Sequence, residues 1–486
     1  MYNKKYSSII SLVLIAIIFQ FLPLIGMSQH IIIYPAPKGE VIDQTYTVLV
    51  KGKKLAIYKV KVASGDTQQR FKATDDLMNS AKYFDTAAFC YFSTPSAVAV
   101  SVQIKESIKS IVVLPLCYHI KPIISAHKII FSVQPNQNLT IEINGNKINS
   151  LHIFSNAVDH FIPKKGQPNV IYFGPGIHEV TSMVIKDNQT VYVAGGAIIR
   201  AVIGKNEKYT TEPSGLRNYA PTFILSGRHI KFEGQGIIDG SGCPSHSRNL
   251  LSVIHGKDIS IKDVILKNPC GWTIPIMQSD SIKITNVKII GYRANSDGID
   301  ICNSRNIIIN NCFIRTSDDL IVIKSFENQG KVDHILIENC ILWNQLANAM
   351  SIGGELREDV SNVLFSNCHI IHDLSRECSL RIFQCDGSKI SNIRFENLDI
   401  AEANRFISLW IGKAGPSFDN NLGYIQDIIF KNIKVDGLQP GTEIIGADIN
   451  HKITNVSFIN IKLNGQILNK GQMRLNPYTQ DIIIQP

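Results

Sequence analysis

One alternation of apolar and polar positions recurs through the C-terminal half of the chain. Each copy reads apolar-x-apolar-x-Asn-apolar-x-apolar, as in IKITNVKI around Asn286. The polar slot falls at Asp263, Asn286, Asn311, Asn339, Asn367, Asn397, Asn432 and Asn460, in steps of 23 to 35 residues. Weaker copies carry glycine in that slot, at Gly174, Gly195 and Gly234. Such periods indicate stacked supersecondary units, and alternation within a unit indicates strands.

These repeats predict a right-handed parallel β-helix, in which equivalent positions of successive coils stack about 4.8 Å apart. Asparagine suits the bend between two sheets, because it tolerates left-handed backbone geometry and can bond its neighbours in adjacent coils. A leucine-rich horseshoe is the main alternative, but the repeats lack a leucine framework and a helical half. A second apolar strand recurs in most coils, for example at 297–301 and 319–323, which predicts a continuous parallel sheet along one face.

Residues 30–163 show a different pattern of short alternating segments, such as YTVLVKG and VAVSVQI, separated by turn signals such as Asn144-Gly145. This pattern favours an antiparallel β-sandwich, with a linker at residues 156–169. We therefore expect an all-β chain with a β-sandwich domain at 29–163 and the β-helix at 164–486. The sandwich sequence contains no catalytic cluster.

The N-terminus reads as a targeting segment. Two lysines precede a mostly apolar stretch from Ile9 to Ile25, and small residues follow it, so residues 1–28 are predicted to be a signal peptide. An uncleaved membrane anchor is the alternative, although the stretch is short for a span of about 20 residues. We expect an exported protein, periplasmic or extracellular, with no membrane span once the signal is removed.

The ten cysteines suggest disulfides in an exported chain, but three of them argue otherwise. Cys312, Cys340 and Cys368 occupy the same repeat position, where other coils carry apolar residues, so we expect them to pack in the interior as small hydrophobes. Cys378 and Cys385 are a possible pair. Metal-type CxxC spacing is absent, and we expect no metal and no cofactor.

The net charge of +9 is spread thinly along the chain, without a lysine or arginine run. It favours acidic glycans or surfaces slightly and gives no case for nucleic acid. We expect a monomer whose partner is a polysaccharide or oligosaccharide substrate.

Three carboxylates form the candidate active site. Asp297 and Asp319 are 22 residues apart and open equivalent strands, and Asp318 precedes Asp319. Carboxylates on adjacent coils cannot all ionise freely, so at least one should hold a proton near neutral pH. Such a group supplies the acid and the base that glycoside hydrolysis requires. A calcium site, which Asp300 could join, is the alternative.

The motifs NSDGID (295–300), SDD (317–319), SIG (351–353) and RI (381–382) resemble those of glycoside hydrolase family 28, the polygalacturonases. The N-terminal strands and NVIYFGPGIH (169–178) are similar to family 49, the dextranases and isopullulanases. The resemblance extends from about Phe154 to the C-terminus and is looser before it. It implies that Asp318 is the general acid, that Asp297 and Asp319 hold the hydrolytic water, and that the anomeric configuration is inverted. Carboxyl groups on adjacent coils lie closer together than the two catalytic carboxyl groups of inverting enzymes usually do.

Two departures from the family pattern concern the substrate. Asn348 stands where polygalacturonases carry a histidine, and Phe383 stands where they carry the lysine of Arg-Ile-Lys. A neutral α-glycan is therefore a candidate beside galacturonan, although Lys324 and Arg357 could supply positive charge.

Six residues are candidate substrate contacts. Glu355 could equally be an exposed loop acid. Each tryptophan fits plain packing somewhat better than sugar binding, and Trp410 is the best placed of them to stack on a sugar. The set is Asn295, Lys324, Asn348, Glu355, Arg381 and Trp410. The sequence thus predicts a secreted glycoside hydrolase that cleaves α-glycosidic bonds. A calcium-dependent polysaccharide lyase and a non-catalytic glycan-binding β-helix are the alternatives.

Overall fold

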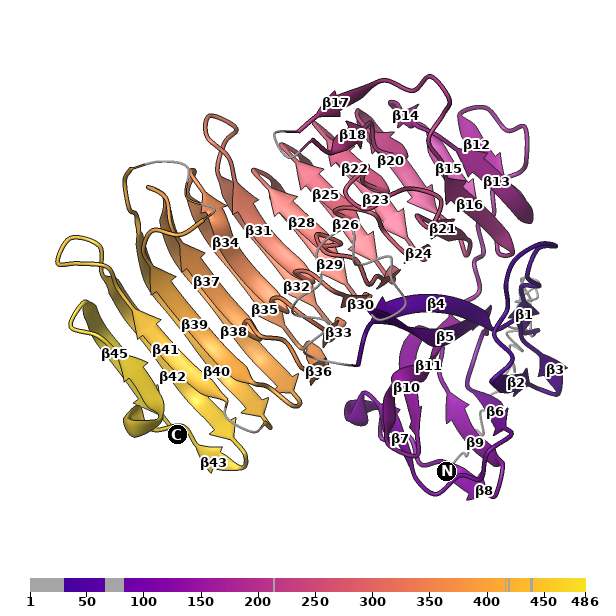
Figure 1. Ribbon diagram of the computed structural model, residues 1–486, viewed down its shortest axis with the longest axis horizontal. Helices are drawn as coiled ribbons and strands as arrows, with labels where there is room; N and C mark the ends of the chain where they lie inside the picture. The colour runs from indigo at the N-terminus through magenta and orange to yellow at the C-terminus, as the bar shows by residue number, and fades with distance from the viewer. Residues whose placement is uncertain (1–29, 66–82, 213–214, 416, 418–419, 438–439) are drawn as a thin grey trace, which may run out of the picture.

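The computed structural model describes residues 30–65, 83–212, 215–415, 417, 420–437 and 440–486 (Figure 1). The predicted signal peptide lies outside these residues. No helix within them is long and apolar enough to cross a membrane.

Residues from Val170 onward coil into a parallel β-helix whose axis follows the long dimension of the molecule (Figure 1). One face is an 11-stranded parallel sheet: β14 (Met183–Ile185), β19 (Phe223–Leu225), β22 (Leu251–Ile254), β25 (Ile274–Met277), β28 (Ile299–Cys302), β31 (Ile321–Ser325), β34 (Met350–Leu356), β37 (Leu380–Gln384), β39 (Arg405–Ile411), β41 (Gly441–Ile445) and β44 (Met473–Leu475). From β22 to β39 these strands coincide within two to three residues with the second apolar strand that the sequence predicts in most coils.

The other faces form one 21-stranded sheet that bends at the asparagine positions. Its strands are β12 (Val170–Phe173), β13 (Gly176–Val180), β15 (Thr190–Val193), β16 (Ala197–Ala201), β20 (Arg228–Glu233), β21 (Ile237–Asp239), β23 (Lys257–Lys262), β24 (Ile265–Lys267), β26 (Asp280–Thr285), β27 (Lys288–Ile290), β29 (Arg305–Asn310), β30 (Phe313–Thr316), β32 (Val332–Glu338), β33 (Ile341–Asn344), β35 (Val360–Ser366), β36 (His369–Asp373), β38 (Lys389–Ile400), β40 (Tyr424–Val435), β42 (Ile453–Leu463), β43 (Gln466–Ile467) and β45 (Thr479–Gln485). A hairpin of β17 (Tyr209–Thr211) and β18 (Arg217–Tyr219) and the short 3-10 helix η3 (Lys470–Gln472) complete this part.

The repeat asparagines adopt the predicted left-handed geometry, with φ between 52° and 57° from Asn286 to Asn460. They also bond from coil to coil. The side-chain amide of Asn432 donates to Oδ1 of Asn397 at 3.0 Å, and that of Asn460 donates to Oδ1 of Asn432 at 3.0 Å. The prediction for the bend position is therefore confirmed, and we call this row of side chains the asparagine ladder.

The interior of the β-helix is one apolar core. Cys312, Cys340 and Cys368 are fully buried in it, as predicted. All ten cysteines are free, so the possible pair Cys378–Cys385 does not form.

A β-sandwich precedes the β-helix, and its two sheets enclose a second apolar core. One sheet contains β1 (Ile32–Ile33), β4 (Tyr58–Ala63), β5 (Phe84–Ser93), β7 (Ile111–Leu114), β10 (Gln137–Ile143) and β11 (Asn146–Asn156). The other contains β2 (Tyr46–Val50), β3 (Lys53–Lys54), β6 (Val98–Ile104), β8 (Ile123–Ser125) and β9 (Lys128–Val133), and η2 (Leu116–Tyr118) follows β7. The sequence pattern suggested an all-antiparallel sandwich, but β5 and β11 pair in parallel.

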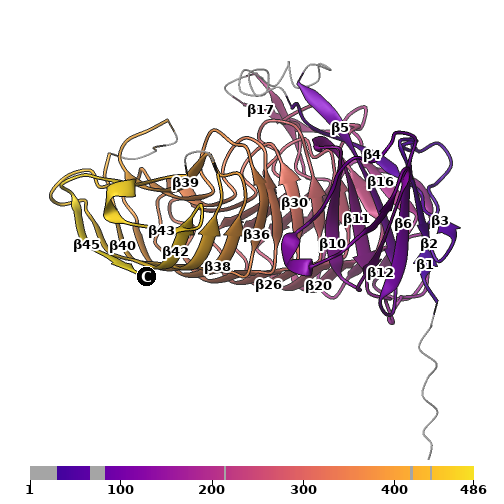
Figure 2. The ribbon, with the colours of Figure 1, turned by 90° about the horizontal axis from the view of Figure 1, so that it is seen from below.

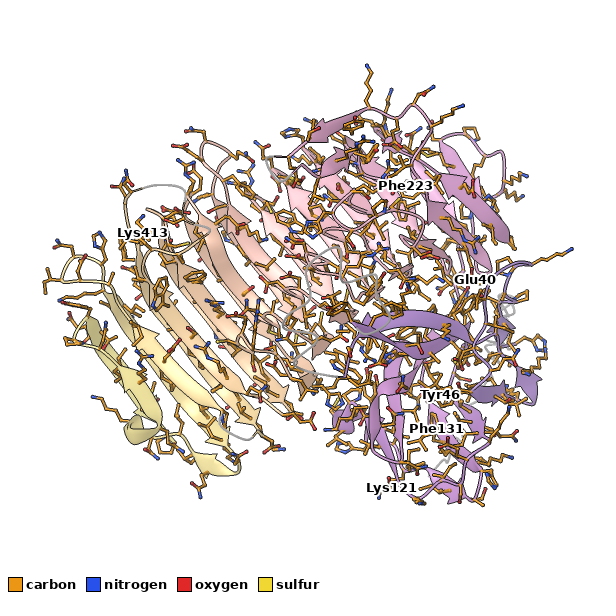
Figure 3. The ribbon with its side chains drawn as sticks, in the orientation of Figure 1. Glu40, Tyr46, Lys121, Phe131, Phe223 and Lys413 are labelled. Atoms are coloured by element: carbon orange, nitrogen blue, oxygen red, sulfur yellow. The ribbon has the colours of Figure 1, made fainter. Side chains whose placement is uncertain are left out.

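The sandwich lies against the side of the β-helix (Figures 1 and 2). Phe89 and Phe154 on the outer face of its first sheet pack with Phe313 and Trp343 of β30 and β33. Glu40 (Figure 3) adds an ion-paired link, because its carboxylate contacts Arg200 at 2.8 Å and Lys267 at 2.7 Å. The boundary between domains at residues 163–164 remains a prediction. The structure has no strand between β11 and β12, at residues 157–169.

Candidate active site

Asp297 and Asp319 occupy equivalent positions on neighbouring coils, two residues before β28 and β31. The register pairs Ile299 with Ile321, and the N–H of Gly298 donates to the carbonyl of Asp319 at 2.8 Å. A Cβ on Gly298 would lie 2.3 Å from the carbonyl oxygen of Leu320, so only glycine permits this approach. One carboxylate oxygen each from Asp297, Asp318 and Asp319 lies within 4.8 Å of the others. The structure thus brings the three predicted acids together.

Asp318 is half-buried and faces a cavity. Its carboxylate accepts hydrogen bonds from the backbone N–H groups of Asn295, at 2.9 Å, and Asp319, at 3.0 Å. Burial and the adjacent Asp319 carboxylate raise the pKa of Asp318 to about 6, against the lowering effect of the two N–H donors. Asp318 can therefore exchange a proton near neutral pH.

Asp319 is held by donors only. The backbone N–H and the side-chain amide of Asn348 donate to its Oδ1 at 2.9 and 2.8 Å, and the hydroxyl of Ser351 donates to Oδ2 at 3.3 Å. The side-chain oxygen of Asn348 accepts from the N–H of Cys378 at 3.2 Å, which fixes the amide with its NH₂ toward Asp319. An arrangement of donors alone suits an ionised carboxylate.

Beneath the triad lies a buried charge cluster around Lys324. Its ammonium lies 3.6 Å from Asp297, 3.4 Å from Asp300 and 4.0 Å from Glu355, and 3.9 Å from the centre of the Trp272 ring. Burial, followed by the Asp300 and Asp318 carboxylates, raises the pKa of Asp297 well above its usual value.

Burial also raises the pKa of Asp300 to about 7, although Lys324 opposes the shift. Burial alone would lower the pKa of Lys324, but the carboxylates around it, Asp297 first, raise it well above its usual value. The positive charge of Lys324 is therefore paired with carboxylates of the protein itself.

Two cavities flank the acids along the sheet face. One, of about 460 Å³, extends toward later coils and is lined by the acid pair and by Asn348, Ser351, Arg376, Glu377, Arg381 and Phe383, among others. The other, of about 320 Å³, extends toward earlier coils and is lined by Glu212, Asn218, His246, Asn249, Gly271, Trp272 and Asn295. The acids thus lie between two polar cavities, as a groove for an extended substrate requires.

The remaining predicted contacts divide into those inside the groove and those outside it. Arg381 lines the later cavity, where it donates to Glu377 at 2.7 Å and lies over the ring of Phe383 at 4.3 Å. Trp410 lines neither cavity and packs on Phe383, with ring centres 4.9 Å apart. Arg357 pairs with Glu327 at 2.6 Å and lines neither cavity.

Sequence reasoning missed the tryptophan that does line the groove. Ile274 pairs with Ile299 in register, so Trp272 occupies the position of Asp297 one coil earlier. Aligning the second strand of each coil would have found it. Glu377 and His246 carry no such signal, because both lie in loops between coils.

The three acids are also the one group among the described residues whose oxygens could together hold a metal ion. Oxygen ligands suit calcium. The ammonium of Lys324 already lies beside this group, and it supplies one positive charge there.

Comparison with known proteins matches residues 179–476 to the family described as glycosyl hydrolases family 28. An exopolygalacturonase of Arabidopsis thaliana is 26% identical over 281 residues, covering 54% of this chain and 60% of the relative. A polygalacturonase of Juniperus ashei is 27% identical over 227 residues, covering 41% and 43%. An α-L-rhamnosidase, rgxB, of Aspergillus niger is 26% identical over 250 residues, covering 47% and 51%. Each alignment thus covers less than two thirds of the relative's length.

Two solved structures share the fold over nearly the whole chain. Dex49A from Penicillium minioluteum superposes with a TM-score of 0.57 at 14% identity and covers 93% of this chain and 96% of its own. The family 28 exopolygalacturonase of Yersinia enterocolitica gives a TM-score of 0.51 at 14% identity, with coverage of 94% and 95%. The likeness therefore includes the N-terminal sandwich as well as the β-helix.

Proposed function

The chain belongs to glycosyl hydrolases family 28, and from this premise we propose that it is an exported enzyme that hydrolyses α-glycosidic bonds of a polysaccharide or oligosaccharide. The observation that carries the proposal is the convergence of Asp297, Asp318 and Asp319 between two cavities. Three carboxyl groups at that spacing share protons, and hydrolysis of a glycosidic bond needs one proton donor and one acceptor.

Asp318 is assigned the role of general acid. It borders the later cavity, and its pKa of about 6 lets it hold a proton near neutral pH and release it to the leaving oxygen. The two backbone N–H groups that bind its carboxylate then stabilise the negative charge left behind.

Asp297 and Asp319 are assigned to the attacking water. Asp319 accepts three hydrogen bonds from Asn348 and Ser351, which hold its oxygens in place, and we assign it as the proton acceptor of the two. Asp297, whose pKa is raised well above its usual value, orients the water from the neighbouring coil. The roles of both residues follow the family resemblance and agree with these contacts.

A neutral sugar is the substrate class that we propose for the groove, because the two cations closest to carboxylates there are already paired. Uronate binding favours a cation with spare positive charge, and Arg381 is paired with Glu377 while Lys324 serves three carboxylates. Arg376 lies 3.7 Å from the same Glu377, so the two arginines share one carboxylate and Arg376 is the cation that a uronate could engage. The relative described as an α-L-rhamnosidase is consistent with a neutral substrate within the family.

A calcium-dependent lyase is the competing activity, because clustered carboxylates suit that cation. A lyase also needs a basic group to accept a proton from the sugar. Lys324 is the cation nearest the acids, and its raised pKa makes it a poor proton acceptor.

The test is a panel of neutral and acidic polysaccharides incubated with the purified protein, with and without a chelator. We expect reducing ends to appear with at least one neutral substrate, unaffected by chelation and without the ultraviolet absorbance of unsaturated products. Unsaturated products that disappear on chelation would establish the lyase. Release of no sugar from any substrate would leave glycan binding as the function of the fold.

A further inference from the structure

The asparagine ladder is interrupted at one position. Side-chain hydrogen bonds join its rungs from Asp263 through Asn286 to Asn311, and again from Asn367 to Asn460. The two missing steps both involve Asn339, whose side chain makes no hydrogen bond with the described residues, although its φ of 57° matches that of the other rungs. The amide of Asn339 is therefore available to an external partner.

A cavity of about 450 Å³ opens where the ladder is interrupted. It lies in the seam between the sandwich and the β-helix, away from the three acids, and we call it the seam cavity. The β-helix contributes Lys262, Asp263, Thr285, Asn286, Asn310, Asn311, Asn339, Ile341, Asn367 and His369, and the sandwich contributes Tyr118, Asn136, Gln137, Ala157, Val158 and Asp159. Figure 2 shows the sandwich beside the coils that carry these residues.

The seam cavity offers further hydrogen-bonding atoms without partners. The Thr285 hydroxyl is buried and makes no hydrogen bond. The Asn367 amide accepts from Asn397 but its NH₂ donates to no described residue. The buried Thr285 hydroxyl is the costly one of these groups, whereas Asn339 and Asn367 are exposed, so a ligand can reach their amides. Asn339 sits between them in the ladder order, so a polyhydroxyl molecule could satisfy several amides at once.

The seam cavity is lined by two aspartates and one lysine. Lys262 is its only lysine or arginine, and the ammonium lies 3.5 Å from Asp263. Burial lowers the pKa of His369, so that side chain is neutral at neutral pH. Asp159 accepts from the N–H of Phe161 at 3.0 Å and from the hydroxyl of Tyr192 at 3.3 Å. An anionic ligand would meet no spare cation here, whereas neutral hydroxyl groups match the amides.

We propose that the seam cavity is a second, non-catalytic binding site for a neutral saccharide. Sugar hydroxyls donate to Oδ1 of Asn339 and accept from the NH₂ groups of Asn339 and Asn367, which replaces the missing ladder bonds. Thr285 adds a third contact. The site holds glycan at the side of the coils and does not depend on which bond the acids cleave.

The test is calorimetric titration of isomaltotriose and maltotriose, with trigalacturonate as the acidic counterpart, into the full chain carrying Asp318→Asn. We expect a neutral trisaccharide to bind and trigalacturonate not to bind at this site. In the same background Asn339→Gly should weaken neutral binding about tenfold, the change that loss of a hydrogen-bonded pair produces. Glycine keeps the left-handed backbone, so the variant removes the amide alone.

Asn460→Gly is the control, because it removes a ladder amide that bonds only Asn432 and lies outside the seam cavity, and it leaves the bond between Asn397 and Asn367 in place. It should bind as the parent does. Thr285→Val, which removes only the unpaired hydroxyl, should weaken binding without loss of thermal stability. Equal affinity of the Asn339→Gly and Asn460→Gly proteins, or no binding of either neutral trisaccharide, would overturn the proposal. Hydrolysis by the Asn339→Gly protein with Asp318 intact is measured separately. It tests the proposed activity of the three acids and does not depend on the seam cavity.

Discussion

Asn348 binds Asp319 twice, through its backbone N–H at 2.9 Å and its side-chain amide at 2.8 Å, both to Oδ1. The second bond is the one that substitution can remove. We expect Asn348→Ala to lower kcat about 10- to 100-fold with little change in KM, because a hydrogen bond to a charged group contributes about 1.5–3 kcal/mol. Steady-state kinetics on the substrate found in the panel measures both constants.

The matched control for this variant is Asn404→Ala, which removes an amide bonded to Ser375 outside the groove cavities. It should turn over as the parent does. A rise in KM with unchanged kcat in Asn348→Ala would instead make Asn348 a substrate-binding residue.

The pH dependence of turnover should follow Asp318. A general acid works only while protonated, and burial with the Asp319 charge places its pKa at about 6. We therefore expect kcat/KM, which reports the pKa values of the free enzyme, to be highest below pH 6 and to fall about tenfold per pH unit well above it. Because Asp297, Asp318 and Asp319 interact, the pH profile gives an apparent pKa for the three acids together and not for Asp318 alone. Asp318→Asn should be inactive at every pH with its fold intact by circular dichroism, and retained turnover would exclude Asp318 as the acid.

Removal of the Lys324 charge should destabilise the protein. Its side chain is 7% exposed and lies within 4.0 Å of three carboxylates, and loss of one partner of a buried pair costs about 3–5 kcal/mol. Asp300, whose pKa is already about 7 with the lysine present, should then bind a proton more tightly. The loss in unfolding free energy of Lys324→Met should therefore be larger at pH 8 than at pH 5, as measured by urea denaturation.

The double variant Lys324→Met, Asp300→Asn separates charge from packing. It should recover part of the stability at pH 8, because the uncompensated carboxylate is gone. No recovery would mean that Lys324 stabilises the protein through its contact with Trp272.

His372 should link the sandwich to the β-helix in a pH-dependent way. Its ring nitrogens bond Glu142 of the sandwich and Glu402 of the β-helix. Burial lowers the pKa of His372, but these two carboxylates outweigh it and the net pKa is raised. The stabilisation is thus complete below the unfolded value of about 6.5 and disappears as the pH rises through the folded pKa.

We expect His372→Gln to lower the unfolding free energy more at pH 6 than at pH 9, in urea denaturation at both values. The exposed His334→Asn, on the outer surface beside Asp333, provides the control and should show little change at either pH. A deficit in His372→Gln that is independent of pH would assign its role to packing on Trp343, whose ring centre is 4.3 Å away.

The stereochemistry of cleavage is open to a direct measurement. The three carboxylates have oxygens within 4.8 Å, which is closer than the roughly 6.5–9.5 Å typical of inverting enzymes. The family resemblance nevertheless implies inversion, with Asp319 accepting a proton from water. Proton NMR of the first product should show the anomer opposite to that of the substrate. Retention would require Asp297 or Asp319 to act as a nucleophile.

The β-helix and its acids were predictable because stacking makes both visible in sequence. A bend that requires left-handed backbone selects asparagine in coil after coil, from Asn286 to Asn460. Once the coils are aligned, Asp297 and Asp319 become neighbours without further information. Register along the second strand would also have placed Trp272 in the groove.

Two strands of the sandwich, β5 and β11, were not among the strands predicted from the sequence, and there is a physical reason for this. In β5, Ala88 and Cys90 face the sandwich core while Phe89 and Tyr91 face the β-helix. A strand covered on both faces has no polar alternation. The pairing of Arg381 with Glu377 was equally hidden, because the path of the loop that carries Glu377 has no repeat to set it.

The sheet that contains β5 has a consequence for dissection of the molecule. A chain cut at residues 157–169 would leave Phe313, Trp343 and their neighbours uncovered, and apolar surface of that kind promotes association. We expect isolated coils to precipitate and the isolated sandwich to expose Phe89 and Phe154 in the same way. We therefore expect the two halves to unfold as a single cooperative unit.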